Sequence, residues 1–196
     1  MNLLSGFILA GGASSRMGTD KAELLIAGQT FVQRIAAAMA STVSSVALVG
    51  KPLATGPNIP TVPDVHEHWG ALGGVHAALA ACESRWALIV ACDLPFVTEA
   101  LLARLTGFAD AFEAVAPIQA DGRPQPLCAL YQVNPCLEKA ERLIKSGERR
   151  PIALLQSVRA RWVDFSELSD LDGADRFFDN INTPDDYSRV NKEGVS

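Results

Sequence analysis

Short apolar runs alternate with longer segments of mixed polarity along this chain. The apolar runs, rich in Val, Ile, Leu and Ala, predict buried strands at residues 6–9, 46–49, 86–91, 114–118, 127–131 and 161–163. The mixed segments predict helices at residues 31–40, 71–82, 98–108 and 135–146, and a last helix after Thr183, which is a suitable cap. Residues 51–63 are dense in Gly and Pro and predict a surface connection.

This alternation of strands and helices predicts the α/β class. Such a pattern favours a mainly parallel, mixed sheet covered by helices on both faces, in three layers. At 196 residues the chain has the length of one domain, so we expect a single domain over residues 1–196. Ligands of open α/β sheets bind beyond the carboxyl ends of the strands. We therefore expect the functional residues directly after the predicted strands.

Composition and charge narrow the classes of function. Hydrophobic residues make up 48% and charged residues 20%, which is ordinary for a globular protein, and no apolar run is long enough to cross a bilayer. The N-terminus lacks a basic region and a cleavage site, so we expect a cytoplasmic protein without membrane contact. A net charge of -5 argues against nucleic-acid binding. The cysteines show neither metal-type nor disulfide-type spacing and are expected to be reduced, mostly buried thiols: Cys82, Cys92, Cys128 and Cys136.

The segment LAGGASSRMGTDK, residues 9–21, has the composition of a phosphate-binding loop. Its glycines allow backbone N–H groups to approach an anion, and Arg16 and Lys21 supply positive charge. The spacing differs from GxxxxGK[ST] and from GxGxxG, so neither the P-loop nor the dinucleotide-binding motif is present. From the residues alone, a plain glycine turn remains the alternative.

Asp93 directly follows the apolar run at residues 86–91. A carboxylate at such a place must pair, bind a metal or face a cleft, because burying an unpaired charge is costly. Mg²⁺ binds one or two carboxylates together with substrate phosphate oxygens, which suits a single aspartate at a strand end. The alternative is an N-cap for the next helix, but Thr98 is better placed for that role. The pattern favours Mg²⁺ binding at Asp93.

The full string LAGGxSxRMGxDK resembles the signature of nucleotidyltransferases with a Rossmann-like fold, and most closely that of the molybdenum cofactor guanylyltransferases, the MobA family. The similarity continues along almost the whole chain. Further motifs that carry it are LLIAGQTFVQR (24–34), GALGG (70–74), CDLPF (92–96), QPLCALY (125–131), GERR (147–150) and FDNINTPDD (178–186).

The resemblance implies roles for individual residues. It implies nucleotide binding by Leu9, Ala10, Gly11, Gly12, Lys21, Asp64 and Asp93. Catalytic roles fall on Arg16, Lys21 and Asp93, with Mg²⁺ at Asp93, and acceptor binding on Asn180, Asn182, Arg149 and Arg150. From the residues alone, a turn role for Asp64 and for the two asparagines, and a helix-dipole role for the two arginines, stay open.

The sequence departs from the family pattern at two positions. Val49 and Gly50 stand where well-known members carry an asparagine, and Ala71 replaces the usual proline of GPLxG. Between them, His66 and His68 are spaced for metal chelation, but no third ligand is evident, so a polar loop is the favoured interpretation.

The implied reaction is transfer of GMP from GTP to the phosphate of molybdopterin, with or without bound molybdenum, and release of pyrophosphate. Other molybdenum-cofactor biosynthesis proteins and molybdoenzyme maturation factors are candidate partners. The alternatives are a molybdopterin cytidylyltransferase, a sugar-1-phosphate nucleotidyltransferase and a nucleotide-binding module without activity. LAGG, in place of LAAG, resembles the guanylyl branch, and retention of Lys21 and Asp93 argues against the inactive module.

Overall fold

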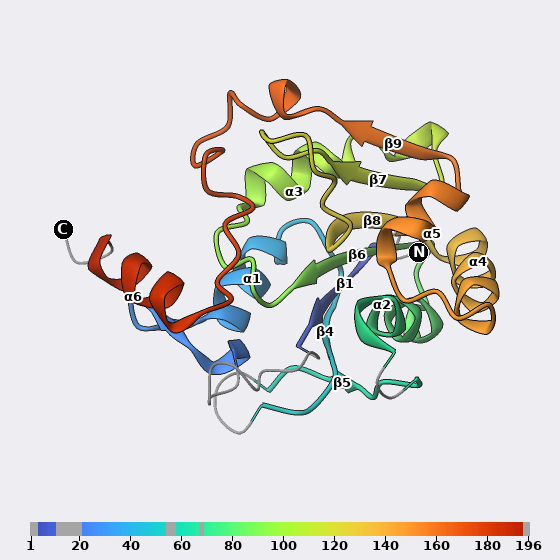
Figure 1. Cartoon of the computed structure of the whole chain (residues 1–196), viewed down its shortest axis with the longest axis horizontal. Coiled ribbons are helices and arrows are strands. Elements are labelled where there is room, and N and C mark those ends of the chain that lie inside the picture. Colours follow the sequence, from blue (N-terminus) through green and yellow to red (C-terminus); the bar gives the residue numbers. More distant parts are fainter. Residues whose placement is uncertain (1–3, 11–20, 54–57, 67–68, 194–196) are drawn as a thin grey trace.

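The computed structural model describes residues 4–10, 21–53, 58–66 and 69–193. A seven-stranded mixed sheet forms the centre of the molecule, in the order β5-β4-β1-β6-β8-β7-β9 (Figure 1). Its strands are β1 (Leu4–Leu9), β4 (Val46–Val49), β5 (Thr61–Val62), β6 (Trp86–Ala91), β7 (Ala114–Pro117), β8 (Cys128–Gln132) and β9 (Ala160–Val163). Only β8 runs against its neighbours, because it pairs antiparallel with both β6 and β7.

Helices cover both faces of this sheet, which confirms the predicted three-layer α/β fold. Helices α1 (Phe31–Met39) and α3 (Glu99–Thr106) pack on one face. The opposite face carries α2 (Gly70–Ala81), α4 (Val133–Lys145) and α5 (Pro151–Ser157). The last helix, α6 (Pro184–Glu193), projects from the body beside a small hairpin of β2 (Leu25–Ile26) and β3 (Gln29–Thr30) (Figure 1).

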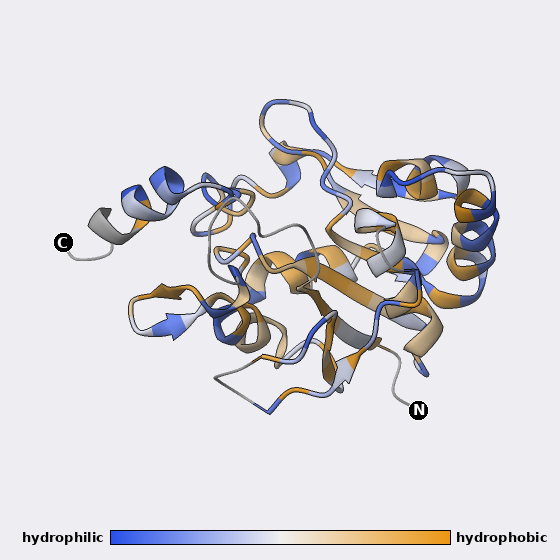
Figure 2. Ribbon diagram, turned by 60° about the horizontal axis from the view of Figure 1, so that its bottom comes forward, coloured by the Kyte–Doolittle hydropathy of each residue, from blue (hydrophilic) through white to orange (hydrophobic). Residues whose placement is uncertain are grey.

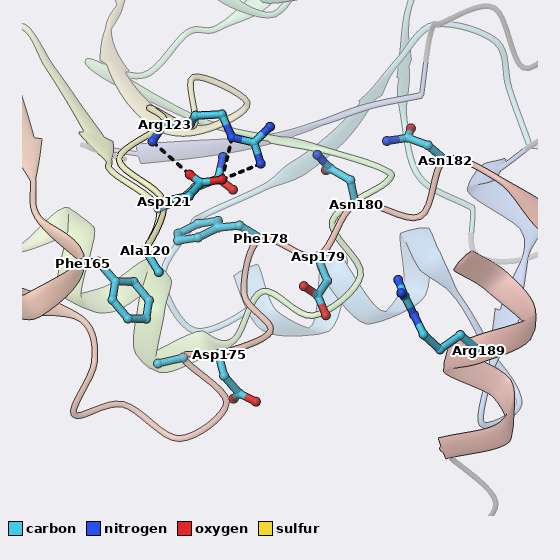
Figure 3. Close-up of a pocket in the computed structure, with 12 residues that line it drawn as sticks. Ala120, Asp121, Arg123, Phe165, Asp175, Phe178, Asp179, Asn180, Asn182 and Arg189 are labelled. Carbon is cyan, nitrogen blue, oxygen red and sulfur yellow. Dashed lines mark hydrogen bonds and ion pairs between the residues drawn. The ribbon is translucent and has the colours of Figure 1, made fainter. Parts of the chain in front are cut away.

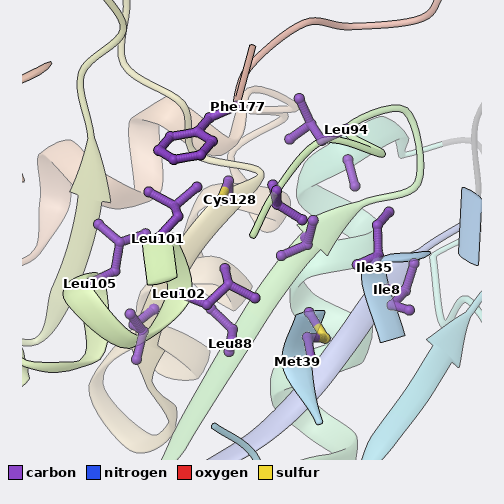
Figure 4. Close-up of a cluster of buried hydrophobic side chains, with 14 of the residues drawn as sticks. Ile8, Ile35, Met39, Leu88, Leu94, Leu101, Leu102, Leu105, Cys128 and Phe177 are labelled. Carbon is purple, nitrogen blue, oxygen red and sulfur yellow. The ribbon is translucent and has the colours of Figure 1, made fainter. Parts of the chain in front are cut away.

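Two apolar cores follow from the alternation of side chains along the strands. Ile8 points to the face that α1 and α3 cover, whereas Phe7 and Leu9 point to the other face. The apolar colouring of the central strands in Figure 2 marks this doubly covered interior. Figure 4 shows the first core, in which leucines of α3 gather with Phe177, Cys128 and Leu88 of β6.

The predicted starts of α1, α3 and α6 are confirmed and have capping hydrogen bonds, whereas α4 begins at Val133, two residues before the predicted start. Thr30 forms a capping box with Gln33 at the start of α1, and the Thr98 hydroxyl accepts from the Leu101 N–H at the start of α3. Thr183 caps α6 by accepting from the Asp186 N–H at 3.1 Å. Because Thr98 is the cap of α3, Asp93 has no capping role in that helix.

Several elements differ from the expectations. The connection predicted at residues 51–63 contains the short strand β5, and α5 and the β2–β3 hairpin were not anticipated. Short 3-10 turns occur at Lys21–Glu23, Ala109–Ala111 and Phe165–Glu167. Among the described residues, no helix combines the length and apolarity that a membrane span needs.

The parallel strands end level with one another. Leu9 is in register with both Val49 of β4 and Ala91 of β6. The chain therefore leaves three adjacent strands at the same edge of the sheet.

Candidate active site at the carboxyl edge of the sheet

The carboxyl edge of the sheet holds the start of the glycine-rich segment. Leu9 is buried and its side chain packs against Gly74 of α2, and Ala10 N–H donates to the Val49 carbonyl at 2.9 Å. The next predicted residues, Gly11, Gly12 and Arg16, lie outside the described residues. The edge of the sheet thus brings Leu9 and Ala10 beside the end of β6, where Asp93 lies two residues beyond the strand.

Asp93 is a partly buried carboxylate at this edge. Burial raises its pKa, since removal from water disfavours the charged form, while the charge of Lys21 acts in the opposite direction. Its backbone carbonyl accepts a hydrogen bond from the Ile181 N–H at 3.1 Å. This bond ties the C-terminal segment to the metal-ligand candidate.

Lys21 meets the same C-terminal segment through its side chain. Its Nζ donates to Asn182 Oδ1 at 2.7 Å, although the two residues are separated by 161 positions. Asn180 and Asn182 are exposed on either side of Ile181, which is buried. The fold therefore brings Lys21, Asp93 and Asn182 into one cluster with Asn180 next to it.

A surface pocket of about 690 Å³ lies beside this cluster, and both asparagines line it (Figure 3). Its other walls are the loop between β7 and β8, the segment before Asn180, and α6. The lining residues are Gln119, Ala120, Asp121, Arg123, Phe165, Ala174, Asp175, Phe178, Asp179, Asn180, Asn182 and Arg189. Most of the lining residues outside the segment 178–186 come from turns that have no recognisable sequence motif.

Charges in the pocket are partly paired. Arg123 Nε donates to Asp121 Oδ2 at 2.6 Å, across a turn in which Gly122 has a φ of +81°. Arg189 approaches Asp186 at 3.5 Å, and both residues are on α6. Phe178 lies beneath the Asp121–Arg123 pair in Figure 3 and gives the pocket an aromatic surface. The lining therefore combines an aromatic surface with three aspartates and two arginines, and both arginines have carboxylate partners.

Asp64 follows β5 and has a local structural partner. Its Oδ1 accepts from the His66 N–H at 3.1 Å, which is the turn role that the residue type favours. The same carboxylate lies beside α2, 3.6 Å from the position that a Cβ on Gly73 would occupy. Asp64 therefore lies at the carboxyl edge of the sheet, after β5, and holds its own turn.

Arg149 and Arg150 do not line the pocket. Arg150 pairs with Glu148 at 2.7 Å, and this partner with two backbone N–H donors lowers the pKa of Glu148 to about 2. The Arg149 guanidinium lies over the ring of Trp69 at 5.1 Å. Trp69 also donates from Nε1 to the Glu148 carbonyl at 2.9 Å. The two arginines thus sit on the α2 side of the edge, apart from Asn180 and Asn182.

The structure shows the surroundings of Gly50 and Ala71, two positions that depart from the family pattern. Gly50 N–H donates to the Val62 carbonyl and offers no side chain to a ligand. Helix α2 begins at Gly70, whose φ of +68° favours glycine, and it forms with Ala71 in its first turn.

Two further predictions concern the histidines of the loop before α2 and the cysteines of the core. Within the described ranges no three His, Cys, Asp or Glu side chains are grouped as metal ligands, and His68 falls outside those ranges. Cys128 and Cys136 are buried, and burial raises the pKa of each thiol to about 12. Both are therefore protonated and unreactive at neutral pH.

Comparison with known proteins gives a consistent result. Residues 6–161 match the family described as the MobA-like NTP transferase domain. A probable molybdenum cofactor guanylyltransferase of Chloroflexus aggregans is 35% identical over 96% of this chain and 93% of its own length. A molybdenum cofactor guanylyltransferase of Desulfosudis oleivorans is 32% identical over 97% and 95%. The crystal structure of molybdopterin-guanine dinucleotide biosynthesis protein A from Archaeoglobus fulgidus superimposes with a TM-score of 0.81 at 25% identity, covering 97% of this chain and 98% of that one.

Proposed function

The chain belongs to the MobA-like NTP transferase family, and on that premise we propose that it transfers GMP from GTP to the phosphate of molybdopterin. An acceptor phosphate oxygen attacks the α-phosphorus of GTP, the bond from that phosphorus to the bridging oxygen breaks, and pyrophosphate leaves. The observation that carries this proposal is the joining of Lys21, Asp93 and Asn182 at one strand edge beside a pocket.

Lys21 supplies positive charge where two polyanions must meet. Fixed positive charge at the phosphates stabilises the charge that develops during transfer. In the structure its ammonium group is held by Asn182, so it is already oriented before substrate binds. Lys21 is therefore assigned to the triphosphate, together with Arg16 of the glycine-rich segment.

The environment of Asp93 fits a Mg²⁺ ion. Its carboxylate is partly desolvated and has the neighbouring charge of Lys21, and the described part of the chain holds no group of three or more His, Cys, Asp or Glu side chains placed for a metal. Mg²⁺ accepts such a site because waters and phosphate oxygens complete its coordination. When bound, the ion would neutralise phosphate charge and polarise the α-phosphate. Asp93 is the residue that would hold it.

The pocket beside Asn180 and Asn182 is assigned to the acceptor. Asn180 and Asn182 lie on its wall nearest to Lys21, and Phe165 and Phe178 offer aromatic faces to a pterin. Amide donors from the asparagines and charge from Arg189 suit the acceptor's phosphate. A phosphate monoester is mostly ionised at neutral pH, so the nucleophile needs no general base. Arg149 and Arg150 are assigned to the part of the acceptor that extends from the pocket towards Trp69.

The experiment that tests this function compares nucleotides. Pyrophosphate release is measured with Mg²⁺, molybdenum-loaded molybdopterin and equal concentrations of GTP or CTP. Preference for GTP is the expected result, since LAGG resembles the guanylyl branch. Preference for CTP would assign the chain to cytidylyl transfer, and release with neither nucleotide would overturn the proposal in favour of a sugar-nucleotide enzyme or an inactive module.

Substitution of either charged residue should abolish most turnover. We expect Lys21→Ala and Asp93→Ala each to lower kcat by about 10²–10³, the scale of losing one group that stabilises transition-state charge. Lys145→Ala, at the exposed end of α4, is the matched control and should retain wild-type turnover. Near-normal activity in either site variant would remove that residue from the mechanism.

We also propose that the chain forms one domain and acts in the cytoplasm. The sheet draws strands from residues 4–163, and Val190 of α6 packs with Ile26 and Phe31, which supports one domain over residues 1–196. We propose a cytoplasmic enzyme whose product is passed to other molybdenum-cofactor proteins or molybdoenzyme maturation factors.

A further inference from the structure

Among the described residues, three attachments join the C-terminal segment Ile181–Tyr187 to the site region. Ile181 N–H bonds the Asp93 carbonyl, and Asn182 accepts from Lys21 Nζ. The third attachment is Tyr187 of α6, whose hydroxyl bonds the backbone of Leu25. The first two attachments involve residues with assigned roles, whereas Tyr187 has none in the proposed reaction.

The Tyr187 hydroxyl makes two hydrogen bonds to one residue. It donates to the Leu25 carbonyl at 2.8 Å and accepts from the Leu25 N–H at 3.3 Å. Leu25 faces Thr30 in the two-residue register of the β2–β3 hairpin, and the neighbouring Leu24 carbonyl accepts from Phe31 N–H. In an antiparallel pair, bonded and non-bonded positions alternate, so the polar backbone groups of Leu25 point away from β3. The phenol therefore satisfies both groups at the open edge of the hairpin.

The hairpin edge leads directly to Lys21. Leu24 N–H donates to the Lys21 carbonyl at 3.2 Å, at the end of the Lys21–Glu23 turn. The Tyr187 ring lies 6.3 Å from the ring of Phe31, in a small core that also contains Ile26 and Ile181. One packed unit therefore joins the strand after Lys21 to the segment that carries Asn182.

The same helix connects to the acceptor pocket. Arg189, two residues after Tyr187, lines the pocket, as do Asn180 and Asn182. At the start of α6, Asp186 accepts from the Asn182 and Thr183 N–H groups at 3.1 and 3.0 Å. The start of α6 and the backbone of Asn182 are thus linked through the Asp186 carboxylate.

We propose that Tyr187 is a positioning residue, which clamps the C-terminal segment to the β2–β3 hairpin so that Asn182, on the wall of the acceptor pocket, is held in register with Lys21. The inference rests on the proposed transfer reaction for its kinetic consequence. Tyr187 acts through Asn182 and makes no contact with the reacting atoms.

Tyr187→Phe tests the clamp because it keeps the ring on Phe31 and removes only the hydroxyl. A net hydrogen bond corresponds to roughly a two- to tenfold change in an equilibrium constant, so the loss of two predicts about a tenfold fall in kcat/KM for molybdopterin. Binding of GTP, measured by calorimetry without acceptor, should weaken less than kcat/KM for molybdopterin, because Lys21 keeps its charge and its own turn when only its hydrogen bond to Asn182 is displaced.

A double-mutant cycle separates positioning from general destabilisation. In an Asn182→Ala background, Tyr187→Phe should change kcat/KM for molybdopterin by less than about twofold, because the side chain that it positions is absent. Multiplication of the two single effects would overturn the proposal. Equal losses in GTP affinity and in acceptor kinetics would also overturn it, since they would indicate a structural role alone.

Hydrogen exchange provides a readout that needs no turnover. The Ile181 amide, which donates to the Asp93 carbonyl, should exchange about tenfold faster in Tyr187→Phe than in wild type, whereas amides of α3 should not change. Tyr131→Phe is the matched control, because it removes a phenol hydroxyl that bonds the Pro126 carbonyl and should leave Ile181 exchange unchanged. Wild-type exchange at Ile181 in Tyr187→Phe would overturn the clamp. If wild type shows no transfer at all, the proposed reaction fails and exchange still decides the clamp.

Discussion

Asp93 has a negative charge at a place where the fold removes much of its water. Lys21 offsets only part of this cost, because burial is the larger influence and raises the pKa of the carboxyl group. Binding sites commonly retain such a charge for function at the expense of stability. The position directly after an apolar strand was visible in the sequence, which is why Asp93 could be selected there. Lys21 was selected from the glycine-rich motif, but the motif by itself does not show that the Lys21 charge lies near Asp93.

Asp93→Asn should stabilise the protein while it lowers turnover. Burial raises the pKa of Asp93 in the folded state above its ordinary value of 3.8, which applies to the unfolded chain. The contribution of Asp93 to stability therefore falls as pH rises from the unfolded-state pKa through the folded-state pKa. At pH 7 the ionised carboxylate therefore costs folding free energy that the amide does not. We expect a gain of about 1 kcal/mol in unfolding free energy at pH 7 without Mg²⁺, from urea denaturation, shrinking as pH approaches 4.

Asp110→Asn, at an exposed aspartate, is the control for this comparison and should change the unfolding free energy little. A loss of stability in Asp93→Asn at pH 7 would contradict the assigned cost of the buried charge.

At the scale of elements, the start of α2 packs closely against the loop that follows β5. A Cβ on Gly73 would lie 2.9 Å from Trp69 Cβ and 3.3 Å from the His66 carbonyl. A Cβ on Gly74 would make ordinary contacts with Leu9 at 3.5 Å. The two consecutive glycines of the GALGG segment therefore differ in how much space surrounds their Cα atoms. Only Gly73 is required for close approach of the loop that carries Asp64.

Gly73→Ala and Gly74→Ala should change stability in opposite directions. In Gly73→Ala the backbone of the loop must shift, which costs about 1–3 kcal/mol, the range of overpacked sites. Gly74→Ala gains about 0.5–1 kcal/mol because alanine favours the helix and fits the space. Thermal and urea unfolding of both variants measure the difference. Equal effects in the two variants would show that the loop does not press on α2 at Gly73.

At the scale of the whole molecule, the buried side chain of His76 lies where α2, α4 and the loop before α2 meet. His76 of α2 is 6% exposed, and its Nδ1 has no hydrogen-bond partner among the residues that the structure describes. Its ring lies 4.8 Å from that of His66 in the loop before α2. Burial lowers the pKa of His76, His66 lowers it further, and the charges of Glu141 on α4 and Asp64 oppose this effect. The packed interface between α2, α4 and the loop therefore requires a neutral imidazole.

The folded protein should lose stability below about pH 6.5 through His76. Its folded-state pKa lies below 6.5, so the unfolded chain binds the proton first, and stability declines as pH falls from 6.5 towards the folded-state value. One group contributes a slope of at most about 1.4 kcal/mol per pH unit. His76→Gln should flatten the decline in unfolding free energy between pH 7.5 and 5.5. An unchanged slope in that variant would assign the decline to other groups.

The sequence by itself determined the elements whose signals are local. Strands β4 and β6 occupy the predicted residues, and Thr98 and Thr183 cap their helices, because hydrophobic periodicity and capping depend on neighbours along the chain. The ordered motifs likewise identified the family that residues 6–161 match. The roles of Gly11, Gly12 and Arg16 remain predictions from those motifs.

Only the tertiary structure decided what depends on distant residues meeting. A short apolar run reads the same in either direction, so the antiparallel pairing of β8 was not predictable from its residues. The contact of Lys21 with Asn182, the stacking of Arg149 on Trp69 and the pocket walls join positions far apart in sequence. Such contacts form because the sheet brings strand ends to one edge, where their side chains share a site that no local pattern encodes.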